Sequence, residues 1–130
     1  MNDNIFFDTN ILIYCYTETE PIKQAIADNP NAWISTQVLQ EFSNTLRKKF
    51  GKTWTEIEAS FEELTQNFEV FTNQSETIRF AFKLAHQYKF SFYDCIILSS
   101  ALACNCTIIY SEDMQNGAII EGKLKIINPF

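Results

Sequence analysis

Four carboxylates in this chain have the side-chain type and the spacing to do metal chemistry: Asp8, Glu41, Asp94 and Asp113. Carboxylates gathered at one place repel, because two unit charges about 4 Å apart cost roughly 4 kcal/mol at an effective dielectric of 20. Such a cluster needs a cation, and oxygen ligands without His or Cys suit a hard ion, Mg²⁺ or Mn²⁺. A carboxylate-held ion of this kind can activate a water and neutralise charge at a phosphate.

The two acids in the first half of the chain each have a simpler alternative. Asp8 directly follows the apolar run 5–7, and its role there could be simply to cap a helix. Asn10, however, adds a neutral oxygen beside it, which favours a ligand site. Glu41 lies within a helical pattern at 36–50, about 60° off the apolar face at 100° per residue. A surface glutamate is the common alternative there, although its position lets it point along the end of a sheet.

The two later acids also carry structural alternatives. Ser91-x-x-Asp94 matches a capping box, yet the helix that it opens is so apolar that its first turn is the only polar part. Asp113, in Ser111-Glu112-Asp113, follows an apolar run at 107–110, where a polar cluster is ordinarily a turn. Glu112 is an alternative ligand to Asp113. The four acids together, rather than any one of them, favour a metal site.

Apolar periodicity predicts the elements that must position these acids. Strands are expected at 5–7, 32–34, 69–71, 107–110 and 124–127. Helices are expected from just after Asp8, after Thr19 with Pro21 in the first turn, at 36–50, from the Thr53/Glu56 capping box to Phe68, from Ser75 to Tyr88, and from Ser91 to Cys104. Alternating strands and helices predict one α/β domain over residues 1–130, with a mostly parallel sheet of about five strands between two helical layers. In such sheets ligands bind at the carboxyl ends of the strands.

Two apolar helix faces follow from the same periodicity. In the helix at 36–50 the expected buried face includes Val38, Phe42, Leu46 and Phe50. In the helix that begins at Ser75 it consists of Ile78, Ala81, Phe82, Ala85 and Tyr88. The run from Cys95 to Cys104 is apolar nearly all round, which predicts a buried helix.

Charge and composition narrow the function. The net charge of −6 gives no global attraction to nucleic acid. The one basic cluster is Arg47, Lys48, Lys49 and Lys52, and we interpret it as the solvated end of a helix, compensating the dipole, in preference to a surface that contacts substrate. No apolar window reaches the roughly 20 residues of a membrane helix, and no targeting segment is recognisable, so we expect a soluble, cytoplasmic protein.

The remaining reactive side chains favour no other chemistry. Four cysteines (Cys15, Cys95, Cys104 and Cys106) lack zinc-ligand spacing and mostly sit among apolar residues, so we expect buried, reduced thiols. The single histidine, His86, lies on the polar side of its helix, which disfavours catalysis by a histidine base.

The order of motifs along the chain resembles the PIN-domain nucleases, and most of all their VapC-type toxin members. The motifs are Asp8-Thr9-Asn10, Gln40-Glu41-Phe42, Phe92-Tyr93-Asp94 and the segment from Ser111 to Gly117. The resemblance covers essentially the whole chain. It implies a PIN-like fold, Mg²⁺ or Mn²⁺ dependence, endonucleolytic cleavage of RNA, a homodimer and a cognate antitoxin. Asp8, Glu41, Asp94 and Asp113 would be the metal-binding and catalytic acids, with Asn10 and Ser111 as supporting polar residues.

One position departs from that family pattern. Asn116 stands where many relatives have a further Asp. An amide can still orient a water or bind phosphate, so we expect Asn116 to be a third supporting residue. Because one charge is missing, the sequence leaves open whether the site binds one metal ion or two.

Two other functions remain compatible with the sequence. A phosphatase or phospho-acceptor domain also places a nucleophilic Asp at a strand end, but the usual versions have a second acid where this chain has Asn10, and a lysine near a later strand end where it has Tyr110-Ser111. A catalytically degenerate PIN-like binding module is the other alternative, and Asn116 is its only support in the sequence.

Overall fold

Six strands are present in the computed structural model, which describes residues 4–17, 29 and 31–130. They are β1 (Ile5–Phe7), β2 (Trp33–Ser35), β3 (Glu69–Phe71), β4 (Ile108–Tyr110), β5 (Ile119–Ile120) and β6 (Leu124–Ile127). The helices of the described residues are α1 (Thr9–Thr17), α3 (Thr36–Lys48), α4 (Trp54–Asn67), α5 (Ser75–Gln87) and α6 (Phe92–Ala103). The helix expected after Thr19 lies outside the described residues.

The strands form one sheet in the order β3-β2-β1-β4-β6-β5. All neighbours pair in parallel except β5 and β6, which pair antiparallel. The mostly parallel α/β sheet is therefore confirmed, and β5, an edge strand of two residues, is the strand that periodicity missed. The chain runs outward from β1 to β3 and then returns to the other side of β1 with β4. Strand order therefore reverses between β1 and β4, which is where ligands bind in open sheets.

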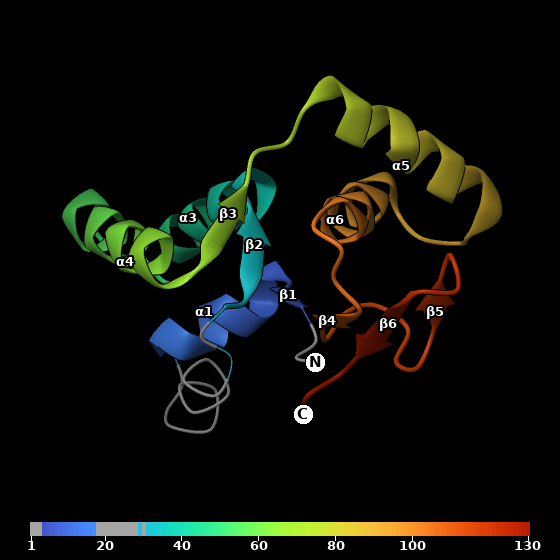
Figure 1. Cartoon of the computed structure of the whole chain (residues 1–130). Helices are drawn as coiled ribbons and strands as arrows, with labels where there is room; N and C mark the ends of the chain where they lie inside the picture. The colour runs from blue at the N-terminus through green and yellow to red at the C-terminus, as the bar shows by residue number, and fades with distance from the viewer. Residues whose placement is uncertain (1–3, 18–28, 30) are drawn as a thin grey trace.

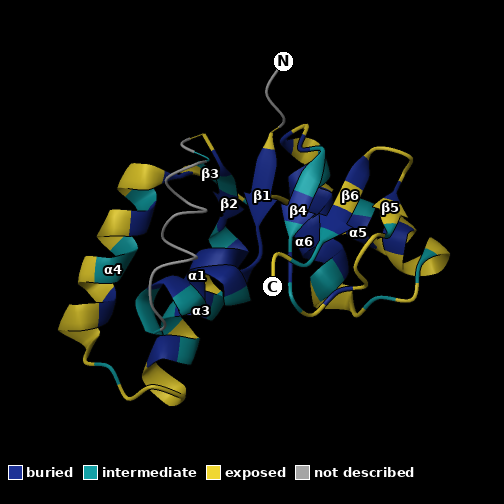
Figure 2. Cartoon of the chain, turned by 90° about the horizontal axis from the view of Figure 1, so that it is seen from below, coloured by how far each residue is buried: buried dark blue, intermediate teal, exposed yellow. Residues whose placement is uncertain are grey.

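Helices cover the sheet on two sides. Figure 1 shows α1, α3 and α4 to one side of the sheet and α5 and α6 to the other. Figure 2 shows that the sheet and the helix surfaces that face it are mostly buried, while exposed residues follow the outer helix surfaces and the turns. The core extends through all three layers, and its largest fully buried side chains include Phe6, Phe7, Phe42, Leu64 and Leu98.

Helix ends follow the signals in the sequence. Thr53 and Glu56 form the predicted capping box at α4. Ser91 caps α6 by accepting a hydrogen bond from the backbone N–H of Asp94. Gly51, which follows the end of α3, has a φ of +61°, a conformation that glycine adopts without steric cost. These caps fix where the first turns that carry Glu56 and Asp94 begin.

Both predicted helix faces need correction. Helix α3 buries Val38, Phe42 and Leu46 as expected, but it ends at Lys48, so Phe50 falls beyond the helix and is exposed. The face predicted for α5 is wrong at Ile78, Phe82 and Ala85, which are exposed. The buried side of α5 is instead formed by Thr77, Ala81 and Leu84. The hydroxyl of Ser99 on α6 donates a hydrogen bond to the backbone oxygen of Thr77. This buried hydrogen bond joins α5 to α6.

Two other expectations hold for the described residues. Helix α6 is buried from Cys95 to Ala101, and all four cysteines are buried and none forms a disulfide within the described residues. None of the helices described is long and apolar enough to cross a membrane.

Candidate active site

Asp8 is the most buried acid at the carboxyl edge of the sheet, with only 6% of its surface exposed. Its position follows from β1, because the parallel register pairs Phe7 with Tyr110 and so brings Asp8 beside Ser111. Oδ1 of Asp8 accepts a hydrogen bond from the backbone N–H of Thr9 (2.7 Å), and Oδ2 accepts one from the hydroxyl of Ser111 (2.8 Å). Both donors come from the point at which strand order reverses.

The pKa of Asp8 reflects its burial, its hydrogen bonds and the negative charges around it. This pKa is raised to about 6, mainly by burial and also by the nearby charges of Asp94 and Glu41, although the hydrogen bonds from Ser111 and Thr9 lower it. Asp8 therefore shares an electrostatic environment with two of the three other predicted acids.

Glu41 reaches this environment from the second turn of α3. It is half-buried, and its Oε1 accepts a hydrogen bond from the hydroxyl of Thr9 (2.9 Å). Thr9 thus contacts two acids, Asp8 through its backbone and Glu41 through its side chain. Sequence patterns did not single out Thr9, and the only signal was its place between Asp8 and Asn10.

Asp94 lies in the first turn of α6 and is half-buried. Burial raises its pKa, a hydrogen bond with Ser91 lowers it, and the charge of Asp113 raises it. Asp94 thereby links Asp8 to Asp113 electrostatically. A capping position and a place in the acidic cluster are both observed, so the two interpretations of Ser91-x-x-Asp94 are compatible.

The two neighbouring acids that follow β4 point to different partners. Asp113 is exposed and accepts a hydrogen bond from the side-chain amide of Asn10. Glu112 instead accepts one from the hydroxyl of Tyr14 on α1 (2.7 Å). Electrostatic coupling to Asp94 involves Asp113. Of the two, Asp113 is therefore the acid that is electrostatically coupled to Asp94.

No cation neutralises these acids within the part of the chain that the structure describes. The one ion pair found among the described residues joins Arg79 to Glu76, both on α5. Three of the four acids instead accept a hydrogen bond from a neutral side chain: Asp8 from Ser111, Glu41 from Thr9 and Asp113 from Asn10. Among these residues no three of His, Cys, Asp or Glu are arranged closely enough to hold a metal ion. The acids are therefore electrostatically coupled without forming a closed ligand group.

Other residues singled out in the sequence lie elsewhere. The side-chain oxygen of Asn116 accepts a hydrogen bond from the backbone N–H of Asn128 (2.8 Å), which ties it to the C-terminal segment. His86 is exposed on α5, as its helical position predicts. Gln37, which the sequence did not single out, donates from Nε2 to the backbone oxygen of Tyr93, while its buried Oε1 has no partner. This contact joins α3 to the first turn of α6, one turn before Glu41.

Comparisons with solved structures agree with this architecture. A toxin–antitoxin complex from Klebsiella pneumoniae contains a chain with a TM-score of 0.77 and 23% identity, with 98% of each chain covered. VapC20 of Mycobacterium tuberculosis, described as a toxin that cleaves the sarcin–ricin loop, has a TM-score of 0.69 at 18% identity, covering 85% of this chain and 90% of that one. VapBC2 of Rickettsia felis, bound to a DNA fragment from its promoter, gives 0.66 at 18% identity, with 84% and 87% covered. At these identities the likeness is one of fold.

Comparison with curated protein sequences gives no match. The model of one protein family, described as the PIN domain, does match, over residues 5–115. The matched range runs from the start of β1 past β4 and includes all four acids. The chain belongs to the PIN-domain family.

Proposed function

We propose that this protein is a Mg²⁺- or Mn²⁺-dependent endoribonuclease, acting as one domain over residues 1–130. The observation that carries the proposal is the buried carboxylate of Asp8, held by Ser111 and Thr9 where strand order reverses and coupled to Asp94 and Glu41. The charges of Asp94 and Glu41 raise the pKa of Asp8, and no cationic partner is within ion-pair distance among the described residues, which are the electrostatics of a cation site.

The donor set fits a hard divalent ion. It consists of carboxylate oxygens, without His or Cys, which is the chemistry that Mg²⁺ and Mn²⁺ prefer. PIN-domain nucleases generally use divalent metals. In this chain Asp8, Glu41, Asp94 and Asp113 would hold the ion, which when bound supplies an activated water and neutralises charge at the phosphate.

The chain's own groups prepare the acids for that role. Ser111 and the backbone of Thr9 orient the two oxygens of Asp8, and they lower its pKa against the effect of burial. The hydroxyl of Thr9 orients Glu41, and Asn10 orients Asp113. Because these donors are neutral, they direct the carboxylates without cancelling the negative charge that attracts a cation.

The biological role that we infer is that of a VapC-type toxin. The chain belongs to the PIN family, and structures of similar fold include toxin–antitoxin complexes and a toxin that cleaves the sarcin–ricin loop. The proposed substrate is accordingly RNA, and the proposed partners are a cognate antitoxin and a second copy of the chain, in the cytoplasm. A gene for a small DNA-binding protein next to the gene for this chain would support the pairing.

The test is RNA cleavage by the purified protein. We expect EDTA to abolish cleavage, Mn²⁺ to restore it, and Asp8→Asn and Asp94→Asn to be inactive though folded. Glu58→Gln provides a matched control, since it removes one charge from an exposed position on α4. Wild-type cleavage by Asp94→Asn, or cleavage that persists in EDTA, would show that the assignment is wrong.

A further inference from the structure

The connection between α3 and α4 concentrates positive charge and exposed aromatic surface. We call this region the basic tip, and it consists of Arg47, Lys48, Lys49, Phe50, Lys52 and Trp54. It holds four of the 10 Lys and Arg residues of the chain, and no acidic residue lies between Glu41 and Glu56. Figure 2 shows the tip as a mostly exposed turn at the end of the two helices. The chain as a whole is acidic, so this is a local reversal of charge.

Compensation of the helix dipole accounts for only part of this charge. Arg47 and Lys48 lie in the last turn of α3, where cations are favourable. Lys49 and Lys52 lie beyond the helix. No carboxylate of the described residues lies within ion-pair distance of any of the four cations.

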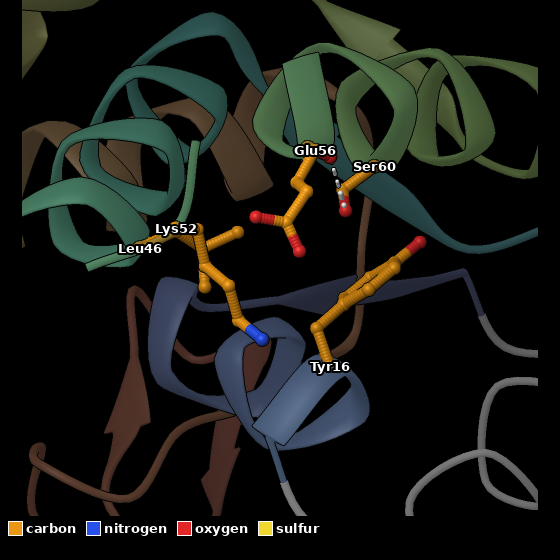
Figure 3. Close-up of a pocket in the computed structure, with 5 residues that line it drawn as sticks. All are labelled: Tyr16, Leu46, Lys52, Glu56 and Ser60. Carbon is orange, nitrogen blue, oxygen red and sulfur yellow. Dashed lines mark hydrogen bonds between the residues drawn. The ribbon is translucent and has the colours of Figure 1, made fainter. Parts of the chain in front are cut away.

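Lys52 differs from the other three cations in its surroundings. Its side chain and that of Glu56 both lie at a cavity of about 120 Å³ that Tyr16 also lines (Figure 3). Hydrogen bonds with Thr53 lower the pKa of Glu56, and the charge of Lys52 also lowers it, so the charges of Lys52 and Glu56 interact. The cations that remain for an external partner are Arg47, Lys48 and Lys49.

The aromatic residues of the tip are unusually exposed. Trp54 is 61% exposed and Phe50 is 45% exposed. The guanidinium of Arg47 lies 5.0 Å from the centre of the Trp54 ring and donates to the backbone oxygen of Lys52 (3.0 Å). These contacts hold the guanidinium of Arg47 over the Trp54 ring at the surface. Proteins bind single-stranded nucleic acid with this combination: cationic side chains contact the phosphates, and a neighbouring aromatic ring stacks on an unpaired base.

The tip is also within reach of the candidate active site. Glu41 and Lys48 belong to the same helix, and seven residues of α-helix span about 10 Å. Three nucleotides of a stacked strand, at about 3.4 Å each, cover a similar length. We propose that the basic tip binds the sugar–phosphate backbone of single-stranded RNA a few nucleotides away from the bond that is cut, with a base stacked on Trp54. This inference rests on the proposed function and adds to it where the substrate is held.

Charge favours RNA over other occupants of this surface. A second copy of the chain docking tip to tip would bring the same cations together, which is unfavourable. RNA brings phosphates, and their contacts with Lys and Arg release counterions. An acidic segment of a partner protein would meet the charges but would not make binding depend on an unpaired base.

The test compares two double variants with the same change in charge. Lys48→Gln/Lys49→Gln alters the tip, and Lys123→Gln/Lys125→Gln removes two exposed lysines near the opposite edge of the sheet, where Lys125 pairs with Ile108 at the start of β4. Both are made in the Asp94→Asn background, and binding of a short fluorescein-labelled single-stranded RNA is measured by anisotropy at several salt concentrations. We expect the tip variant alone to bind more weakly and its slope of log K against log salt to become shallower by about 1.4, or 0.7 per lost phosphate contact.

Trp54→Ala separates stacking from charge. We expect it to weaken binding of single-stranded RNA about tenfold without altering the salt slope, and to affect a fully paired RNA duplex much less. Circular dichroism checks that each variant is folded. Equal affinities and slopes for the tip and control variants would overturn the proposal. So would a tip variant that changes only the sedimenting mass, since this would assign the surface to self-association.

The two proposals fail in different ways. If Asp8→Asn and Asp94→Asn are inactive but the tip variant binds RNA like its control, the ribonuclease assignment stands and the basic tip is not its RNA-binding surface. In the active protein we expect Lys48→Gln/Lys49→Gln to raise KM and leave kcat nearly unchanged, because the tip does not contact the reacting phosphate. A fall in kcat alone would contradict the placement.

Discussion

The hydroxyl of Ser111 donates a hydrogen bond to Oδ2 of Asp8 over 2.8 Å, although 103 residues of sequence separate them. The contact depends on the parallel pairing of β1 with β4, whose register sets Phe7 opposite Tyr110. Ser111 is fully buried, and its oxygen also accepts a hydrogen bond from the backbone N–H of Met114. One side chain therefore orients an acid and stabilises the turn that contains Asp113.

Removal of this hydroxyl should change both stability and acidity. We expect Ser111→Ala to lower the free energy of unfolding at pH 7.5 by about 2 kcal/mol, because a charged, buried carboxylate loses a donor. The pKa of Asp8 should rise further, since the bond from Ser111 lowers it. Urea unfolding across a pH series measures both quantities. Ser99→Ala is the control, since it removes a buried hydroxyl from α6 that contacts no acid, and a pH dependence that shifts equally in both variants would contradict the assignment.

Asp8 should make the metal-free protein less stable as the pH rises. The folded chain holds the proton of Asp8 up to a pKa of about 6, whereas an unperturbed Asp has a pKa of 3.8. Between these values the folded state binds more protons than the unfolded state, so the stability falls as the pH rises from about 4 to about 6. A difference of two pKa units corresponds to about 3 kcal/mol.

Asp8→Asn tests this directly. In EDTA the variant should be more stable than the wild type at pH 7.5 and equally stable near pH 4, with no decline between the two. Thermal melting in EDTA over this range gives the comparison. A wild-type stability that does not change between pH 4 and 6 would mean that the pKa of Asp8 is near its ordinary value.

Asp113 and Glu112 should differ in metal binding despite being adjacent. Asp113 is coupled to Asp94, while Glu112 is held by Tyr14 on α1. We expect Asp113→Asn to weaken Mn²⁺ binding about tenfold in calorimetry, and Glu112→Gln to leave it nearly unchanged. The opposite order would identify Glu112 as the ligand.

Asn116 offers a test of the position where many PIN-domain relatives have an acid. Its side-chain oxygen is occupied by the backbone N–H of Asn128. We therefore expect Asn116→Ala to lower the melting temperature by a few degrees through loss of one exposed hydrogen bond, with Mn²⁺ affinity unchanged. A loss of Mn²⁺ affinity with unaltered melting would instead place Asn116 beside the metal.

Sequence patterns located the strands closely because their signals are local. Ile5-Phe6-Phe7 and Glu69-Val70-Phe71 were predicted with the observed bounds, and β2 differs by one residue. The capping box at Thr53 and the buried run of α6 were likewise readable, since caps and apolar runs need only neighbouring residues. The α5 face was not, because Ile78 and Phe82 repeat at helical spacing although the packing partner α6 meets Thr77, Ala81 and Leu84. Apolar periodicity identifies a row of residues on one side of a helix, but packing against the neighbouring helix decides which side is buried.

The sequence by itself determined which acids stand at strand ends and first helical turns, and which family the chain resembles. Only the tertiary structure decided their partners: Thr9 for Glu41, Asn10 for Asp113, Tyr14 for Glu112 and Asn128 for Asn116. The physical reason is that these hydrogen bonds join residues 12 to 103 positions apart in sequence. Their geometry is set by sheet register and helix packing, which no local pattern encodes.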